Sequence, residues 1–100
     1  MSKYRFTPQA ADDLFLIWRH IAADNQNAAD GVEEAVYAAC EMLAQKPFAG
    51  FVREDLTALP VRFWLVLPYR NYWVVYDPRE KPLRIIRILH AARDIEKALS

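Results

Sequence analysis

The residues best suited to chemistry gather between positions 84 and 96, where the chain reads RIIRILHAARDIE. Within this stretch, Arg87, His90, Arg93 and Asp94 surround two alanines, at the point where an apolar run becomes polar. Arginine binds carboxylates and phosphates, and histidine exchanges protons near neutral pH. The cluster could therefore be a catalytic site, a surface that binds another macromolecule, or only the polar end of a strand.

Arg87 would lie on a strand among apolar neighbours, so its guanidinium must reach a carboxylate, a carbonyl group or the rim of the sheet. One interpretation is a structural ion pair with Asp94, Asp77 or Glu54, because a buried charge is normally paired. The other interpretation is functional, with Arg87 forming part of a basic groove on the exposed face of the sheet.

The basic groove would be built by Arg62, Arg87 and Arg93, which together could hold a phosphate. His90 is the histidine beside this cluster and is the natural general acid or base. A lone histidine at a strand end is, however, more often a hydrogen-bonded structural residue. His20 is expected to be solvated on the first helix. Neither histidine has metal-ligand spacing to another ligand, so no metal and no other cofactor is expected.

Two helices and four strands are expected to position these residues. Apolar residues from Leu14 to Ile21 recur at helical spacing, which predicts an amphipathic helix over residues 8–24. A second helix is expected from its cap at Asn27 to Lys46, where the following proline stops it. A connection of about three residues favours an antiparallel helical hairpin.

Four runs of alternating, β-branched or aromatic residues predict strands over residues 3–7, 61–67, 72–77 and 83–90. Short turns join the last three, which should form an antiparallel meander, and a loop over residues 47–60 precedes them. The order β-αα-βββ predicts an α+β fold, a helical hairpin packed on one face of a mostly antiparallel sheet.

The strand over residues 83–90 should be central, because both of its faces are partly apolar. Strict alternation divides its side chains between Leu83, Ile85, Arg87 and Leu89 on one face and Arg84, Ile86, Ile88 and His90 on the other. After this strand, residues 92–99 are expected to form a helical turn or a short helix.

Composition and length indicate one domain over residues 1–100, with 54% apolar residues available for its core. No apolar run is long enough to cross a membrane, and the start of the chain lacks the apolar region of a signal peptide, so a cytoplasmic protein is expected. The single Cys40 forms no internal disulfide. Residues 1–50 carry four Lys/Arg and seven Asp/Glu, against nine and six in residues 51–100, which predicts one acidic and one basic face.

Four segments resemble the ParE branch of the RelE/ParE toxin superfamily, also called plasmid stabilisation proteins. They read FTPQAADDLFLIWRHIA, LAQKPFAGFVREDL, VRFWLVLPYRNYWVVYDP and IIRILHAARDI, in this order. The resemblance implies the toxin of a type II toxin–antitoxin module with the RelE/ParE toxin-like fold. It also implies DNA gyrase as the target and a ParD-like antitoxin whose disordered tail folds on the toxin. No catalysis and no sequence-specific binding of nucleic acid are expected. The residues expected to face the target are Arg62, Arg87, His90, Arg93 and Asp94.

A second reading is a RelE-like endoribonuclease that cuts mRNA on the ribosome. Its catalytic set would be His90 for proton transfer, with Arg62, Arg87 and Arg93 on the phosphate. RelE-like toxins are known for basic residues in the middle of the sheet and a tyrosine near the C-terminus. The segment AARDIEKALS has no tyrosine, and Ala91 follows His90, which counts against this reading. A third reading is a decayed binding module that keeps the fold without a target.

The antitoxin has two expected routes of binding. It could add a strand to the edge strand at Tyr4 and Phe6, or it could place a helix in an apolar groove between the hairpin and the sheet. The residues expected to line this groove are Leu14, Trp18 and Phe51.

Overall fold

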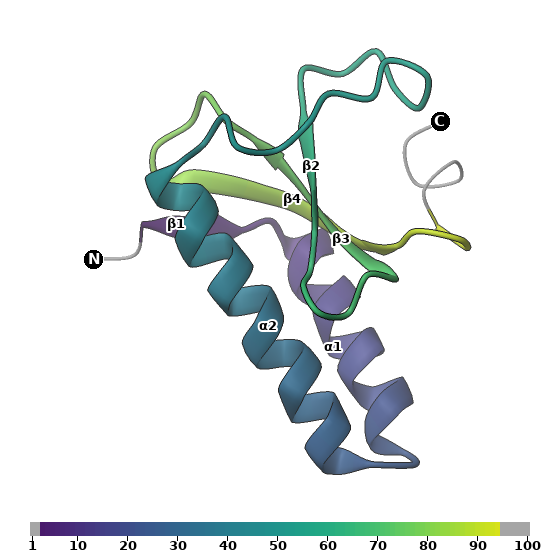
Figure 1. Cartoon of the computed structure of the whole chain (residues 1–100). Coiled ribbons are helices and arrows are strands. Elements are labelled where there is room, and N and C mark those ends of the chain that lie inside the picture. Colours follow the sequence, from purple (N-terminus) through teal and green to yellow (C-terminus); the bar gives the residue numbers. More distant parts are fainter. Residues whose placement is uncertain (1–2, 95–100) are drawn as a thin grey trace.

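Two helices and four strands follow one another in the predicted order, in a computed structural model that describes residues 3–94 (Figure 1). The elements are β1 (Tyr4–Phe6), α1 (Pro8–Ala22), α2 (Gln26–Gln45), β2 (Arg62–Leu65), β3 (Tyr72–Asp77) and β4 (Leu83–His90). The α+β fold expected from the sequence is confirmed. The helix expected over residues 92–99 lies mostly outside the described residues, and residues 91–94 form a turn.

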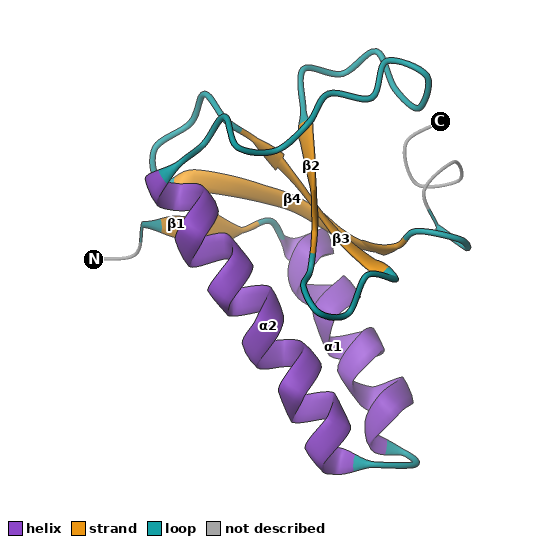
Figure 2. Ribbon diagram, in the orientation of Figure 1, coloured by secondary structure: helices purple, strands orange, loops and turns teal. Residues whose placement is uncertain are grey.

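The sheet has the strand order β1-β4-β3-β2. β2, β3 and β4 form the expected antiparallel meander, while β1 pairs in parallel with β4, with Tyr4 opposite Leu83 and Phe6 opposite Ile85. The two helices lie on one side of this sheet and the loop between α2 and β2 lies on the other (Figure 2). The sheet is therefore mixed, and its longest strand is central, as predicted.

Polar caps set where both helices begin. The Thr7 side chain accepts a hydrogen bond from the Ala10 N–H at 3.1 Å, and Pro8 occupies the first helical position. The cap of α2 is Asn25, whose side chain accepts from the Ala28 N–H at 3.0 Å, so the prediction of Asn27 was two residues late. Helix α1 ends at Ala22, before a turn that leads into this second cap.

The core lies between the helical hairpin and the facing side of the sheet. Leu14, Val36 and Leu43 from the helices pack with Ile85 and Ile88 of β4, and all five are buried. Cys40 is also buried here, and burial raises the pKa of its thiol to about 12, so it is a packing residue.

One irregularity in β4 distributes its side chains between the two faces of the sheet. Val75 and Tyr76 are consecutive in β3, yet they pair with Arg87 and Ile85, so Ile86 is an extra residue in a β-bulge. The strict alternation expected for residues 83–90 is therefore wrong. Leu83, Ile85 and Ile88 enter the core beneath the helices, whereas Ile86 and Leu89 contact the opposite cluster.

The face of the sheet away from the helices has its own apolar cluster. Its centre is Phe63, Val75 and Leu89, which are fully buried, and Leu56 and Trp73 pack against them. The loop over residues 47–60, called the strap from here on, covers this cluster. Segments on either side of the sheet thus bury both faces of its central strands.

Tyr76 pins the start of the strap. Its hydroxyl accepts a hydrogen bond from the Gly50 N–H at 2.9 Å and donates one to the Pro47 carbonyl at 2.7 Å. A Cβ atom at position 50 would collide with this hydroxyl, so the close approach requires glycine. Phe51 then pairs with Phe63 as an isolated antiparallel bridge.

Tyr76→Phe should loosen the strap without disturbing the core. The change leaves the Gly50 N–H and the Pro47 carbonyl without their buried partner, and it should lower the free energy of unfolding by about 1–3 kcal/mol. Urea unfolding measures the loss, and hydrogen exchange at Gly50 shows where it acts. An unchanged stability together with slow exchange at Gly50 would contradict the assigned anchor.

Candidate target-binding site

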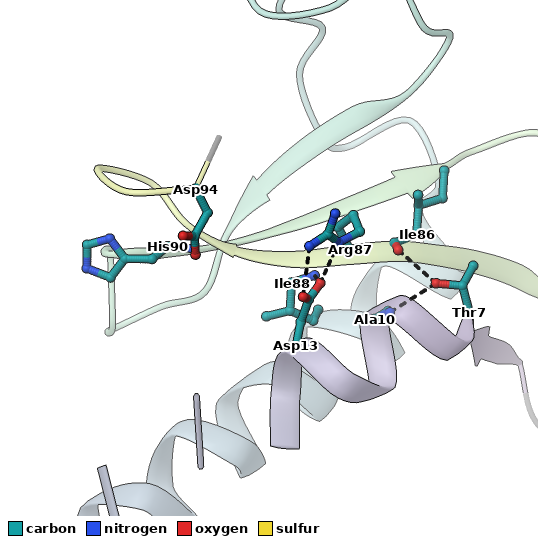
Figure 3. A network of polar contacts seen from close by, with 8 residues as sticks. All are labelled: Thr7, Ala10, Asp13, Ile86, Arg87, Ile88, His90 and Asp94. Carbon is teal, nitrogen blue, oxygen red and sulfur yellow. Dashed lines mark hydrogen bonds and ion pairs between the residues drawn. The ribbon is translucent and has the colours of Figure 1, made fainter. Parts of the chain in front are cut away.

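Arg87 forms an ion pair with Asp13 of α1, a residue 74 positions earlier in the chain. The guanidinium donates from Nε to Oδ2 at 2.7 Å and from Nη2 to Oδ1 at 2.9 Å (Figure 3). These hydrogen bonds raise the pKa of Arg87 above its ordinary value. The structural pairing expected for Arg87 is present, but the expected partners are wrong. Asp77, one of them, instead accepts hydrogen bonds from Arg79.

The Asp13 carboxylate also holds the backbone of β4. Its Oδ2 accepts a hydrogen bond from the Ile88 N–H at 3.0 Å. β1 pairs with β4 only as far as Ile85, so beyond this point the outer edge of β4 has no neighbouring strand. Thr7 bonds the Ile86 carbonyl at 2.8 Å on the same edge. Side chains at the start of α1 therefore take the place of a strand and protect this edge.

The same edge ends in a tight turn formed by the HAARD sequence. The Asp94 carboxylate accepts from the His90 N–H at 3.0 Å, and the Arg93 and Asp94 N–H groups both donate to the His90 carbonyl. His90 Nδ1 accepts a 3.3 Å hydrogen bond from the Ala92 N–H, and the imidazole meets the Tyr72 ring edge-on at 5.5 Å. We call Arg87, His90, Arg93 and Asp94 the corner.

An open groove of about 540 Å³ lies between the corner and α1. Leu16, Ile17 and Ile88 supply apolar lining, while Arg87, Arg93, Asp13 and Asp94 supply charge. His20 and Tyr72 also line it. His20 is exposed on α1, as expected from the sequence, and the packing of α1 against β4 also brings it to this groove.

Arg62 lies apart from the corner. Its Nη1 donates to the Gly50 carbonyl at 2.8 Å, and its guanidinium lies over the Phe48 ring at 5.1 Å. In the sheet register Arg62 pairs with Tyr76, whereas His90 pairs with Tyr72 at the other end of β3. The structure thus brings Arg87, His90, Arg93 and Asp94 together, but the single groove expected from Arg62, Arg87 and Arg93 does not form.

The residues expected to bind an antitoxin are also divided. Leu14 and Trp18 line a second groove of about 600 Å³ on the helical hairpin, together with Phe6, Phe15, Tyr37, Asp30 and Glu33. The Trp18 indole donates to Asp30 at 2.8 Å and ties α1 to α2. Tyr4 lies on β1 with its ring 6.1 Å from that of Phe6. Phe51 belongs to the strap on the opposite face, against Phe63 and Trp73, and so does not share the hairpin groove.

Within residues 3–94, no three His, Cys, Asp or Glu side chains gather in a way that could hold a metal ion. Neither α1 nor α2 is long and apolar enough to cross a membrane.

The Asp13–Arg87 contact can be measured with a double-mutant cycle. Asp13→Ala and Arg87→Ala should each cost about 2–4 kcal/mol, because each leaves a largely buried charge without its partner. The double variant should lose less than the sum of the two, with a coupling free energy above about 1 kcal/mol. Asp13→Asn, which can still accept from the Ile88 N–H, should be milder than Asp13→Ala. Additive losses in urea unfolding would show that the pair does not hold α1 on β4.

The sequence and the fold are both similar to those of known proteins. The sequence profile of the family described as ParE toxin of the type II toxin–antitoxin system parDE matches residues 4–95. A chain from the chromosomal ParDE toxin–antitoxin system of P. aeruginosa superimposes with a TM-score of 0.69, over 90% of this chain and 96% of that one, at 24% sequence identity. No curated protein matches the sequence. The structural likeness gives the fold, and the profile spans nearly the whole sequence, so the chain belongs to the ParE toxin family of type II toxin–antitoxin systems.

Proposed function

We propose that this chain is a toxin that inhibits DNA gyrase by binding it, acts in the cytoplasm and is neutralised by a cognate ParD-like antitoxin. Membership of the ParE family supports the proposal. The main supporting observation is that the face of the sheet away from the helices is filled with apolar side chains beneath the strap. On this proposal, the chain acts through contacts with a partner and not through bond chemistry.

The covered face argues against RNA cleavage in the middle of the sheet. Phe63, Trp73 and Val75 occupy the two strands where a RelE-like nuclease is expected to carry basic residues, and Phe51 packs over them. An RNA backbone needs cations and free surface for its phosphates. The apolar cluster beneath the strap provides neither.

The corner is better suited to binding. The Arg87 guanidinium is occupied by Asp13, so it stabilises the fold and is not free to neutralise a phosphorane. Arg93 is exposed and makes no side-chain ion pair with any residue that the structure describes. An exposed arginine beside a groove with apolar lining fits a protein surface that presents a carboxylate next to an aliphatic side chain.

The hairpin groove is the proposed seat of the antitoxin tail. Phe6, Leu14 and Trp18 give it an apolar lining, and Asp30 and Glu33 give it an acidic rim. This combination fits an amphipathic helix with basic residues beside its apolar face. An antitoxin truncated before its tail should lose most of its affinity for the chain in calorimetry. Unchanged affinity after truncation would show that the antitoxin tail does not bind in the hairpin groove.

Arg93→Glu tests the corner as the target-facing surface. Reversing this charge should raise the toxin concentration needed to inhibit plasmid supercoiling by gyrase about tenfold or more. Lys81→Glu, the same charge reversal in the exposed turn before β4, is the matched control and should behave as the wild type. Equal potency of Arg93→Glu and the wild type would show that the corner is not the surface that binds gyrase.

One contact favours a second candidate, the RelE-like endoribonuclease. The edge-on packing of Tyr72 against His90 places two groups capable of proton transfer next to each other. Under this alternative, the wild-type chain cuts mRNA on translating ribosomes and His90→Ala abolishes the cut. Under the gyrase proposal, mRNA stays intact and a folded His90→Ala protein still inhibits supercoiling.

A further inference from the structure

The strap exposes large apolar side chains although it is firmly held. Phe48 is 65% exposed and Val52 is 51% exposed. They flank the segment that Tyr76 and Phe63 anchor by hydrogen bonds to Gly50 and Phe51. Held backbone with solvent-facing aromatic and aliphatic groups is typical of a protein-binding surface.

The sheet register places these side chains beside Arg62. Phe51 and Phe63 exchange both backbone hydrogen bonds at 2.9 Å, so the next residue of the strap, Val52, lies opposite Arg62 on the edge of β2. Side chains alternate, and Val52 and Arg62 therefore point away from the face that Phe51 and Phe63 share. Arg62 in turn lies over the Phe48 ring. We call Phe48, Val52 and Arg62 the strap patch.

The Arg62 guanidinium is held in place but still has hydrogen-bond donors without a partner among the described residues. A guanidinium carries five N–H donors, and within the described residues Arg62 uses one of them, towards the Gly50 carbonyl. Phe48 beneath it and this hydrogen bond fix the plane of the group. Arginines held in this way bind carboxylates in a bidentate manner and often dominate interface energetics.

We infer that the strap patch is a second contact surface for gyrase, one that receives an acidic side chain on Arg62 and an apolar side chain on Phe48 and Val52. The inference rests on the proposed function and deepens it. The charge of Arg62 and its unused donors select a carboxylate, and the flanking apolar surface selects a hydrophobic neighbour.

Substitutions at two exposed positions test the patch with little risk to folding. In supercoiling titrations, Phe48→Ser should raise the half-inhibitory concentration about tenfold. Val52→Glu should weaken inhibition to a similar extent, because it places a negative charge where the partner's carboxylate binds. Val52→Lys should stay within about threefold of the wild type, since its charge attracts that carboxylate. Leu67→Ser, a 53% exposed position past the other end of β2, is the control.

The outcomes separate the two proposals. Inhibition by Phe48→Ser and Val52→Glu at wild-type potency would overturn the strap patch alone. Equal losses of inhibition for Val52→Glu and Val52→Lys would show that the patch does not bind an acidic side chain. A loss of antitoxin binding with unchanged gyrase inhibition would assign the patch to the antitoxin. A wild-type chain that fails to inhibit gyrase would refute both proposals.

Discussion

The contact between Asp13 and the edge of β4 is the constraint on which the rest of the structure depends. One carboxylate binds the Arg87 guanidinium and the Ile88 N–H, and so it joins the first helix to the last strand. Because β1 is only three residues long, the central strand would otherwise present an open edge. With α1 fixed there, the groove opens between the helix and the corner, and the exposed Arg93 lies at its rim.

The two faces of the sheet have separate coverings, and this explains the shape of the candidate surfaces. The β-bulge at Ile86 lets Ile85 and Ile88 both enter the core beneath the helices while Leu89 serves the opposite cluster. That opposite cluster is covered by the strap, which Tyr76 anchors. The strap and its apolar cluster fill the far face of the sheet, and the surfaces that we propose for binding lie outside them, at the corner, the strap patch and the hairpin groove.

Sequence periodicity was sufficient for the elements and for the hairpin and meander, because these depend on neighbours within a few residues. Contacts between distant segments were not accessible in this way. Nothing near Arg87 in the sequence indicates Asp13, since the pair spans 74 residues and arises only when β1 pairs in parallel with β4. The β-bulge in β4 cannot be recognised in the sequence, because the extra residue belongs to a continuous apolar run. Phe51 could equally line a groove or pack on the sheet, and only the path of the strap over the far face decides between these positions.

Arg87, for which the sequence left both a structural ion pair and a binding role open, forms an ion pair with Asp13, and Arg62 lies at a different surface from the corner. Hydrogen exchange of the chain, free and bound to gyrase, would test the resulting account most directly. We expect slowed exchange of the strap between residues 48 and 53 and of the corner between residues 87 and 94, with α2 unchanged. Protection confined to the helical hairpin, or no protection at saturating gyrase, would contradict it.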